Sequence, residues 1–222
     1  MATKLAPLVL CTAFAALAAS PAEAHTRKSA PNRRGAQAEV VFGASACIPG
    51  QGDCRDDTDM SGRTAPLVGL GLNLGWRASR NFFVGGGYSV GWFQPEYEIQ
   101  GDRVYARAYQ NSLFVVLRAI IPLWRFDFGA ELSPGWSRQV FVLDAGNDDA
   151  IYSQGFALRP GLSADLWLSR HLFVGAKIDT ILNFHSSACL RTKGGFSCEI
   201  KSDNRQARVN QLIAGIHLGG TF

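Results

Sequence analysis

The chain carries little charge and no strong excess of either sign. Of its 222 residues, 18% are charged, and 22 Lys and Arg against 18 Asp and Glu leave a net charge of +4. This balance is too mild to predict a nucleic-acid partner. A mean hydropathy of +0.02 also excludes a disordered chain that lacks apolar surface to bury. We therefore expect a folded protein, and this length suffices for one domain with a sizeable core.

Long apolar runs are missing beyond the N-terminal stretch. A membrane-spanning helix needs roughly 18 or more apolar residues in succession, and no such charge-free run follows. The 24 glycines and 11% aromatic residues favour β-structure instead. Walker loops, dinucleotide fingerprints and metal-protease helices are absent too, because Gly85-Gly86-Gly87 lies in a predicted strand and precedes no helix. We expect no cofactor.

The N-terminus has the layout of an export signal. A short basic start at Met1–Lys4 precedes the apolar run Leu5–Ala19, and Ala22-x-Ala24 provides the small residues that signal peptidase reads. We predict a signal peptide over residues 1–24. Residues 25–37 are basic and polar and predict a flexible periplasmic tail. The rest, 38–222, is the predicted barrel domain.

The remaining sequence alternates with a period of two. From Val68 to Trp76 every second residue is apolar, while the residues between are Gly or Asn. Such alternation is typical of β-strands that place their two faces in different surroundings. Eight segments follow this pattern: 38–46, 68–77, 82–92, 104–121, 125–142, 151–168, 172–185 and 206–222.

The connections between these segments alternate in length. Short turns are predicted at 78–81, 122–124 and 169–171, and long polar connections at 47–64, 94–103, 143–150 and 186–205. This regular alternation predicts an up-and-down series of strands, with short turns at one end and long loops at the other.

The composition of the two faces predicts a membrane barrel. One face is rich in Leu and aromatic residues, and the other combines Gly, Ser and Ala with isolated charges of both signs. In lipid a spanning sheet must close so that every backbone group is hydrogen-bonded, and eight strands leave an interior that side chains just fill. We predict an all-β fold, an eight-stranded antiparallel up-and-down transmembrane β-barrel. A secreted lipocalin-like barrel or β-sandwich is the soluble alternative.

The predicted inward face carries charges that can neutralise one another. Four of these residues are acidic and four strongly basic, which favours a salt-bridged plug over an open pore, since buried ions are tolerated in pairs. We interpret them as fillers of the lumen: Arg77, Arg118, Asp127, Glu131, Arg159, Asp165, Lys177, Asp179 and His217.

Aromatic residues gather where the two membrane interfaces should lie. One band borders the short turns and includes Trp76, Phe82, Trp124 and Phe126. The other lies toward the long loops and contains Trp92, Tyr105, Tyr109, Trp136, Phe141, Tyr152 and Phe184. Trp167 borders a short turn as well, but it falls on the inward register.

On these features residues 38–222 resemble the small eight-stranded outer-membrane barrels of Gram-negative bacteria, the OmpA/OmpX/OmpW-like class. The terminal segment Leu212-x-Ala214-x-Ile216-x-Leu218-x-Gly220-x-Phe222 resembles their assembly signal, although Gly220 stands where an aromatic residue is common. The resemblance implies recognition by the barrel assembly machinery through Leu218 and Phe222. It also implies a monomer among outer-membrane lipid and lipopolysaccharide, with both termini in the periplasm.

Four cysteines remain after removal of the signal peptide, which contains Cys11. Cys47 and Cys54 lie in the first long loop, and Cys189 and Cys198 in the last. Four cysteines allow three pairings. We favour Cys47–Cys54 and Cys189–Cys198, but cross-loop bridges stay open because the first and last strands of a closed barrel are neighbours. Exported cysteines usually oxidise, which disfavours a zinc site.

Two loop motifs suggest weaker alternatives. Asp57-x-Asp59-x-Ser61-Gly62 copies the start of a calcium-binding loop, but Val68 stands where the closing Glu is needed. A solvated acidic loop is the preferred interpretation, and we assign no metal.

The second motif is His185-x-Ser187, followed by Glu199, which could form a base, a nucleophile and an orienting carboxylate. Outer-membrane lipid A deacylases look similar in this respect. The favoured hypothesis is nevertheless a non-enzymatic barrel with a structural or surface-interaction role and disulfide-stapled extracellular loops. The alternatives are a narrow channel for small or apolar solutes, with Gly87 and Gly215 lining the passage, and a lipid A hydrolase.

Overall fold

The structure of the chain, a computed structural model, describes residues 31, 33–48, 61–99, 101–144, 149–199 and 209–222. Within these ranges the chain is built almost entirely of antiparallel strands. The described residues contain no helix that is both long and apolar enough to cross a membrane.

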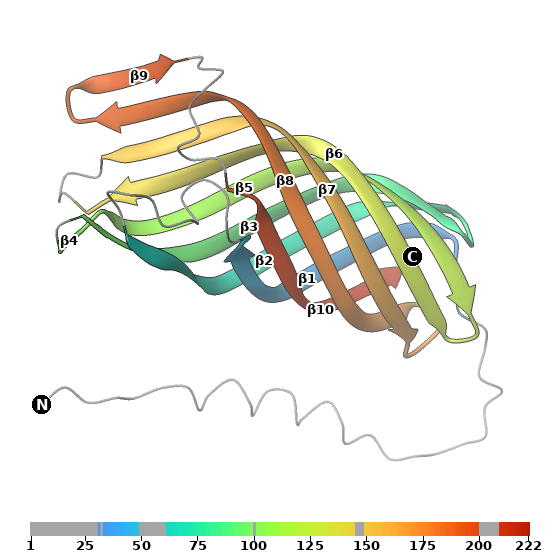
Figure 1. Ribbon diagram of the computed structural model, residues 1–222. Coiled ribbons are helices and arrows are strands. Elements are labelled where there is room, and N and C mark those ends of the chain that lie inside the picture. The colour runs from blue at the N-terminus through green and yellow to red at the C-terminus, as the bar shows by residue number, and fades with distance from the viewer. Residues whose placement is uncertain (1–30, 32, 49–60, 100, 145–148, 200–208) are drawn as a thin grey trace, which may run out of the picture.

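Eight long strands form a closed ring (Figure 1). Each pairs with the next along the chain, and β10 pairs with both β1 and β8, which closes the barrel. This confirms the predicted fold. The eight strands are β1 (Gly35–Cys47), β2 (Ser61–Ser79), β3 (Phe82–Ile99), β5 (Tyr105–Leu123), β6 (Phe126–Leu143), β7 (Ala150–Trp167), β8 (Leu172–Thr192) and β10 (Gln211–Thr221).

Several strands continue into segments that the sequence predicts as loops. Strand β2 already pairs with β3 at Ser61, and β8 runs on to Thr192 and turns back into the short strand β9 (Gly195–Glu199). A second short strand, β4 (Asp102–Arg103), pairs with the end of β3. Polar residues do not end these strands. The backbone hydrogen bonds between two strands can continue without an apolar face where the side chains on both faces contact water or protein.

The barrel also begins earlier than the predicted boundary at residue 38. Gln37 pairs with Thr221 on one side and Gly75 on the other, and its side chain is buried. Residues 35–37 therefore belong to the barrel and not to the N-terminal tail.

The outer face is apolar and exposed along the middle of the ring. Side chains such as Leu74, Leu113 and Phe128 alternate with buried neighbours, as the period of two predicts. The predicted band at the short turns is also exposed, including Trp76 and Trp124. An exposed apolar surface of this extent is typical of a face that contacts a membrane or another protein.

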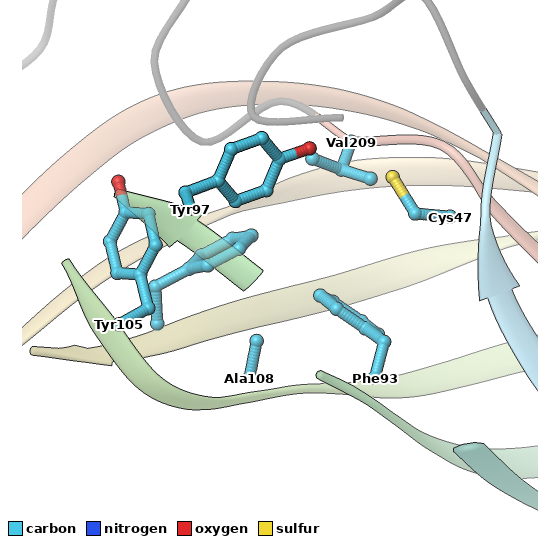
Figure 2. Packing of buried hydrophobic residues seen from close by; sticks show 7 residues of the cluster. Cys47, Phe93, Tyr97, Tyr105, Ala108 and Val209 are labelled. Atoms are coloured by element: carbon cyan, nitrogen blue, oxygen red, sulfur yellow. The ribbon is translucent and has the colours of Figure 1, made fainter. Parts of the chain in front are cut away.

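Three members of the predicted loop-side band are buried instead. Tyr105 and Phe141 point into the barrel. The Phe141 ring packs against the rings of Tyr105 and Phe93, with centroids 5.3 Å and 5.7 Å away. Tyr152 packs against Phe196 of β9, with ring centroids 5.4 Å apart. Figure 2 shows the inner cluster at the loop end of the barrel, whose buried members are Cys47, Phe93, Tyr97, Tyr105, Ala108, Phe141 and Val209.

Two glycines meet where the last strand closes the ring. Gly43 of β1 and Gly215 of β10 are register partners. A Cβ on Gly215 would lie 2.2 Å from the carbonyl oxygen of Phe42, far inside van der Waals contact. The two backbones approach each other here in a way that only glycine allows.

Candidate functional site

The centre of the barrel interior is organised around Arg118 of β5. Its guanidinium lies between two carboxylates, with Nη1 2.6 Å from Glu39 Oε1 and Nη2 2.9 Å from Glu131 Oε2. Two further hydrogen bonds, from Nη2 to Glu39 and from Nε to Glu131, complete a two-sided clamp. All three side chains are buried, so each charge depends on the others for compensation.

Glu131 extends the network toward strands β7 and β8. Its Oε1 accepts a hydrogen bond from Arg159 at 2.7 Å, and its Oε2 accepts one from Lys177 at 2.9 Å. Lys177 also lies 3.3 Å from Asp179. The Glu131 carboxylate thus contacts three cationic side chains. Part of their positive charge is compensated by Asp179, which lies beside Lys177.

Glu39 extends the network in the opposite direction. Its Oε2 lies 3.4 Å from His217 Nε2, while His217 Nδ1 lies 2.9 Å from Asp165. Asn73 donates a hydrogen bond to Glu39 at 3.1 Å and accepts one from Arg159 at 3.2 Å. The contacts therefore form one connected network across the interior, contributed by strands on all sides of the ring.

A second, smaller cluster closes the short-turn end. Asp127 of β6 accepts hydrogen bonds from Arg77 at 2.6 Å, Arg33 at 2.9 Å and the indole of Trp167 at 2.8 Å. Arg33 also donates to the carbonyl oxygen of Trp124 in the β5–β6 turn. Trp167 is buried, in agreement with its predicted inward register.

All nine charged residues predicted to face inward are buried in these two clusters. Sequence reasoning missed Glu39 and Arg33. With them these two clusters of described residues hold five carboxylates and five Arg or Lys side chains in addition to His217. They are Glu39, Asp127, Glu131, Asp165 and Asp179, and Arg33, Arg77, Arg118, Arg159 and Lys177. The sequence carried a signal for Glu39, because the apolar Val40 and Phe42 occupy one face of the predicted strand 38–46 and place Glu39 on the other.

A polar layer without Asp, Glu, Lys or Arg lies nearer the long loops. Both ring nitrogens of His185 are hydrogen-bonded to hydroxyls, Nε2 to Ser137 and Nδ1 to Ser153, each at 2.7 Å. Ser137 also donates to Asn183. This layer belongs to the packed interior, because Ser137 is fully buried.

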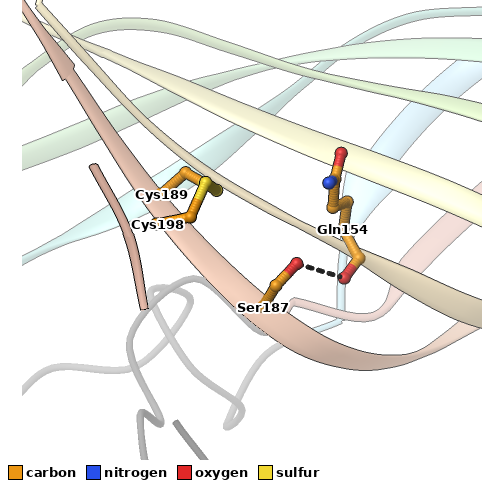
Figure 3. The surroundings of a disulfide bond; sticks show 4 residues. All are labelled: Gln154, Ser187, Cys189 and Cys198. Atoms are coloured by element: carbon orange, nitrogen blue, oxygen red, sulfur yellow. Dashed lines mark hydrogen bonds between the residues drawn. A yellow bond between two sulfur atoms is a disulfide. The ribbon is translucent and has the colours of Figure 1, made fainter. Parts of the chain in front are cut away.

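The structure does not bring His185 and Ser187 together as a base and a nucleophile. His185 pairs with Gly155 and Ser187 with Gln154, so one extra residue of β8 forms a bulge between them. A bulge of this kind reverses the side to which the following residue points. Ser187 therefore donates to the carbonyl oxygen of Gln154 at 3.3 Å (Figure 3), while Glu199 pairs through its backbone with Ala188.

The favoured Cys189–Cys198 disulfide is present and joins β8 to β9 (Figure 3). Cys47 is also disulfide-bonded, whereas Cys54 lies outside the described residues. Asp57 and Asp59 lie outside them too, and Ser61 is described only as the first backbone position of β2. In the described part of the chain no group of three His, Cys, Asp or Glu residues is placed to hold a metal ion.

No family model matches the sequence, and no curated protein matches it. Several solved structures do match the fold. The outer membrane protein OprG from Pseudomonas aeruginosa superposes with a TM-score of 0.57 at 9% identity, covering 87% of this chain and all of that one.

Neisserial surface protein A superposes with a TM-score of 0.54 at 10% identity, over 85% of this chain and 99% of that one. The outer membrane protein AlkL, solved in DMPC lipid bilayers, gives 0.51 at 15% identity over 91% and 97% of the two chains. At these identities the likeness concerns architecture, and it agrees with the ring of eight strands described above. The chain has the fold of the small outer-membrane β-barrel proteins.

Proposed function

We propose that this chain is an integral outer-membrane barrel without enzymatic activity. Its interior is closed, so its structural or surface-interaction role depends on the outer surface and the loops. One observation carries the proposal, namely a continuous buried network across the lumen. It runs from Asp165 through His217, Glu39, Arg118 and Glu131 to Lys177. The ion pairs of this network extend across the lumen, and its positive and negative charges compensate one another. The fold shared with outer-membrane proteins and the exposed apolar outer face support the location.

The proposed orientation places the short turns and both chain termini in the periplasm. Phe222 lies at the short-turn end, where its amide donates to the carbonyl oxygen of Ala36. Leu218 of β10 and Phe222, directly after that strand, are exposed, which suits a role as contacts for the barrel assembly machinery. In this orientation the disulfide-stapled β8–β9 hairpin faces the cell exterior, and the barrel stands as a monomer in lipid and lipopolysaccharide.

Site-specific proteolysis tests this orientation. A protease site inserted between Lys193 and Gly194, in the β8–β9 turn, should be cut in intact cells. The same site between Ser169 and Arg170, in the β7–β8 turn, should be cut only after the outer membrane is permeabilised. Cleavage with the opposite pattern would reverse the proposed orientation, and cleavage of neither site in the membrane fraction would contradict it.

Single-channel recording tests the closed interior. The purified barrel in a planar bilayer should show no steady conductance. The double variant Arg118→Ser/Glu39→Ser removes one opposite-charge pair and its volume, so it should conduct ions if it folds, as checked by gel mobility. A reproducible conductance of the unaltered barrel would favour the alternative of a narrow channel.

The glycines of the inner face argue against that channel. A Cβ on Gly87 would lie 2.9 Å from Cγ2 of Val116 and 3.1 Å from a guanidinium nitrogen of Arg159. A Cβ on Gly215 would lie closer still, 2.2 Å from the carbonyl oxygen of Phe42 in β1. These glycines occupy crowded positions, where they allow neighbouring groups to pack, and they do not line an open passage.

The geometry also argues against the lipid hydrolase. His185 has its ring nitrogens engaged with buried hydroxyls, and Ser187 points elsewhere. Cells that express the chain should therefore release no fatty acid from lipid A, and Ser187→Ala should leave their lipid A unchanged. Loss of a lipid A product in the variant alone would restore the hydrolase hypothesis.

A further inference from the structure

The register of strands β5 to β8 shows where the exposed apolar band of the outer face ends on the loop side. Farther toward the loops the same face continues with apolar side chains such as Val140, Tyr152 and Cys189, but these are buried against one another. One row of paired residues consists of exposed apolar side chains: Leu113, Trp136, Phe156 and Phe184. The next outward-facing row toward the loops is polar and consists of Asn111, Arg138, Gln154 and Ser187. In a membrane barrel, such a step from aromatic to polar residues marks the boundary between hydrocarbon and headgroups.

Arg138 occupies the middle of this polar row. Its guanidinium carbon lies 4.3 Å from the centroid of the Tyr152 ring, which supports the side chain from the loop side. Its Nε is buried and has no hydrogen-bond partner. Asn111 is the register partner of Arg138 on β5. Its side-chain oxygen Oδ1 accepts a hydrogen bond from the Tyr88 hydroxyl, so the side-chain NH₂ group of Asn111 points away from Tyr88.

A second cation lies farther toward the loops on the same outer face. Arg107 is exposed and pairs with Val142, four residues beyond Arg138 along β6. Within the described ranges neither arginine forms an ion pair. The two positions are about 14 Å apart along the strand at the usual rise of an extended chain, which is far enough to engage separate anionic groups.

We propose that this surface, made of Arg107, Asn111, Arg138 and Gln154, binds the phosphates of lipopolysaccharide in the outer leaflet. The inference rests on the proposed location and orientation of the barrel. Arginine recognises phosphate through two parallel hydrogen bonds, which suits a guanidinium with unused donors. The occupant must place anionic groups immediately above acyl chains, because the apolar row of Trp136 lies directly below Arg138.

A protein partner would fit this surface poorly. The row below the arginines stays exposed and apolar across four strands, and hydrocarbon is the medium that covers such a band. A phosphorylated lipid covers both rows at once, with its chains on Leu113, Trp136 and Phe156 and its headgroup on Arg138.

The test uses the full-length mature barrel in nanodiscs of zwitterionic phosphatidylcholine, titrated with purified lipopolysaccharide and followed by native mass spectrometry. Arg138→Gln and Arg107→Gln should each raise the half-saturating lipopolysaccharide concentration about tenfold, the effect expected of one charge-assisted contact. Arg170→Gln is the control, because Arg170 is exposed as Arg107 is but lies at the opposite, short-turn end. It should leave binding unchanged.

Two further arms identify the ligand chemistry. Dephosphorylated lipopolysaccharide should bind no better to the unaltered barrel than to Arg138→Gln, and phosphatidylglycerol should not compete at equal concentration. Equal binding of all three variants, or equal competition by phosphatidylglycerol, would overturn the proposal. Each variant is first shown to be folded by its heat-dependent gel mobility, and the protease-site experiment above reports separately on orientation.

Discussion

Arg118 is the side chain on which the interior depends most. It joins Glu39 and Glu131 and lies over the Phe83 ring, with 5.2 Å between the guanidinium carbon and the ring centroid. Removing one partner of a buried ion pair is costly, because the remaining charge loses its compensation while it stays away from water.

Arg118→Met should therefore lower the free energy of unfolding by about 3–5 kcal/mol. Among the described residues Glu39 then retains the His217 ring as its ionisable neighbour, whereas Glu131 keeps Arg159 and Lys177. Urea unfolding in lipid vesicles, followed by tryptophan fluorescence, measures the effect. Arg170→Met on the exposed turn is the control, and an equal loss in both variants would refute the importance of the network.

At the residue scale the sequence reveals which side chains face inward once a strand has been recognised. The nine predicted residues follow the period of two and are buried. Arg33 could not be found in this way, because it precedes β1 and reaches Asp127 only through the fold. The bulge that separates His185 from Ser187 is likewise a property of strand pairing and leaves no pattern in the residues themselves.

At the scale of single elements, the seam between β1 and β10 is the least tolerant of added volume. Gly215→Ala places a methyl group against the backbone of Phe42, which cannot move without breaking the ladder. We expect a loss of about 1–3 kcal/mol, as for overpacking in cores.

Gly86→Ala is the matched control, since its nearest neighbour, the carbonyl oxygen of Phe114, is 4.0 Å from the added Cβ. Thermal unfolding of the two variants in the same detergent measures the difference. Equal melting temperatures would show that the seam can relax.

The β8–β9 hairpin is a second element with its own stability. The disulfide between Cys189 and Cys198 closes a short loop, and a cross-link of this length contributes about 3 kcal/mol in the chain-entropy account. The double variant Cys189→Ser/Cys198→Ser should speed amide hydrogen exchange over residues 188–199. Exchange in β1 and β10 should be unchanged, because those strands pair elsewhere. Faster exchange throughout the barrel would show that the hairpin supports the whole ring.

Element positions were largely predictable, and their ends were not. Alternating apolar residues located all eight strands, and the three short turns follow from the polar breaks between them. The extension of β3 through Tyr97 and of β8 through Thr192 was missed because exposed loop-side strands carry polar residues on a face that water can reach.

At the scale of the whole molecule, the barrel should behave as one cooperative unit. Every long strand pairs on both sides, so none can leave without opening the ring. In gel electrophoresis the unboiled protein should migrate as a compact species and the boiled protein more slowly, because detergent at room temperature does not open a closed sheet. A single mobility under both conditions would contradict the closed barrel.

The pairing of β1 with β10 has a consequence for how the molecule forms. Gln37 meets Thr221 and Val40 meets Leu218, so the contact that completes the circle joins residues from the two extremes of the folded chain. Contacts between residues so remote in sequence form slowly. Until they form, β1 and β10 each expose an edge of unpaired backbone amide and carbonyl groups. We therefore expect the pairing of β1 with β10 to be a late step of folding, and the unpaired edges of both strands to favour aggregation until it is complete.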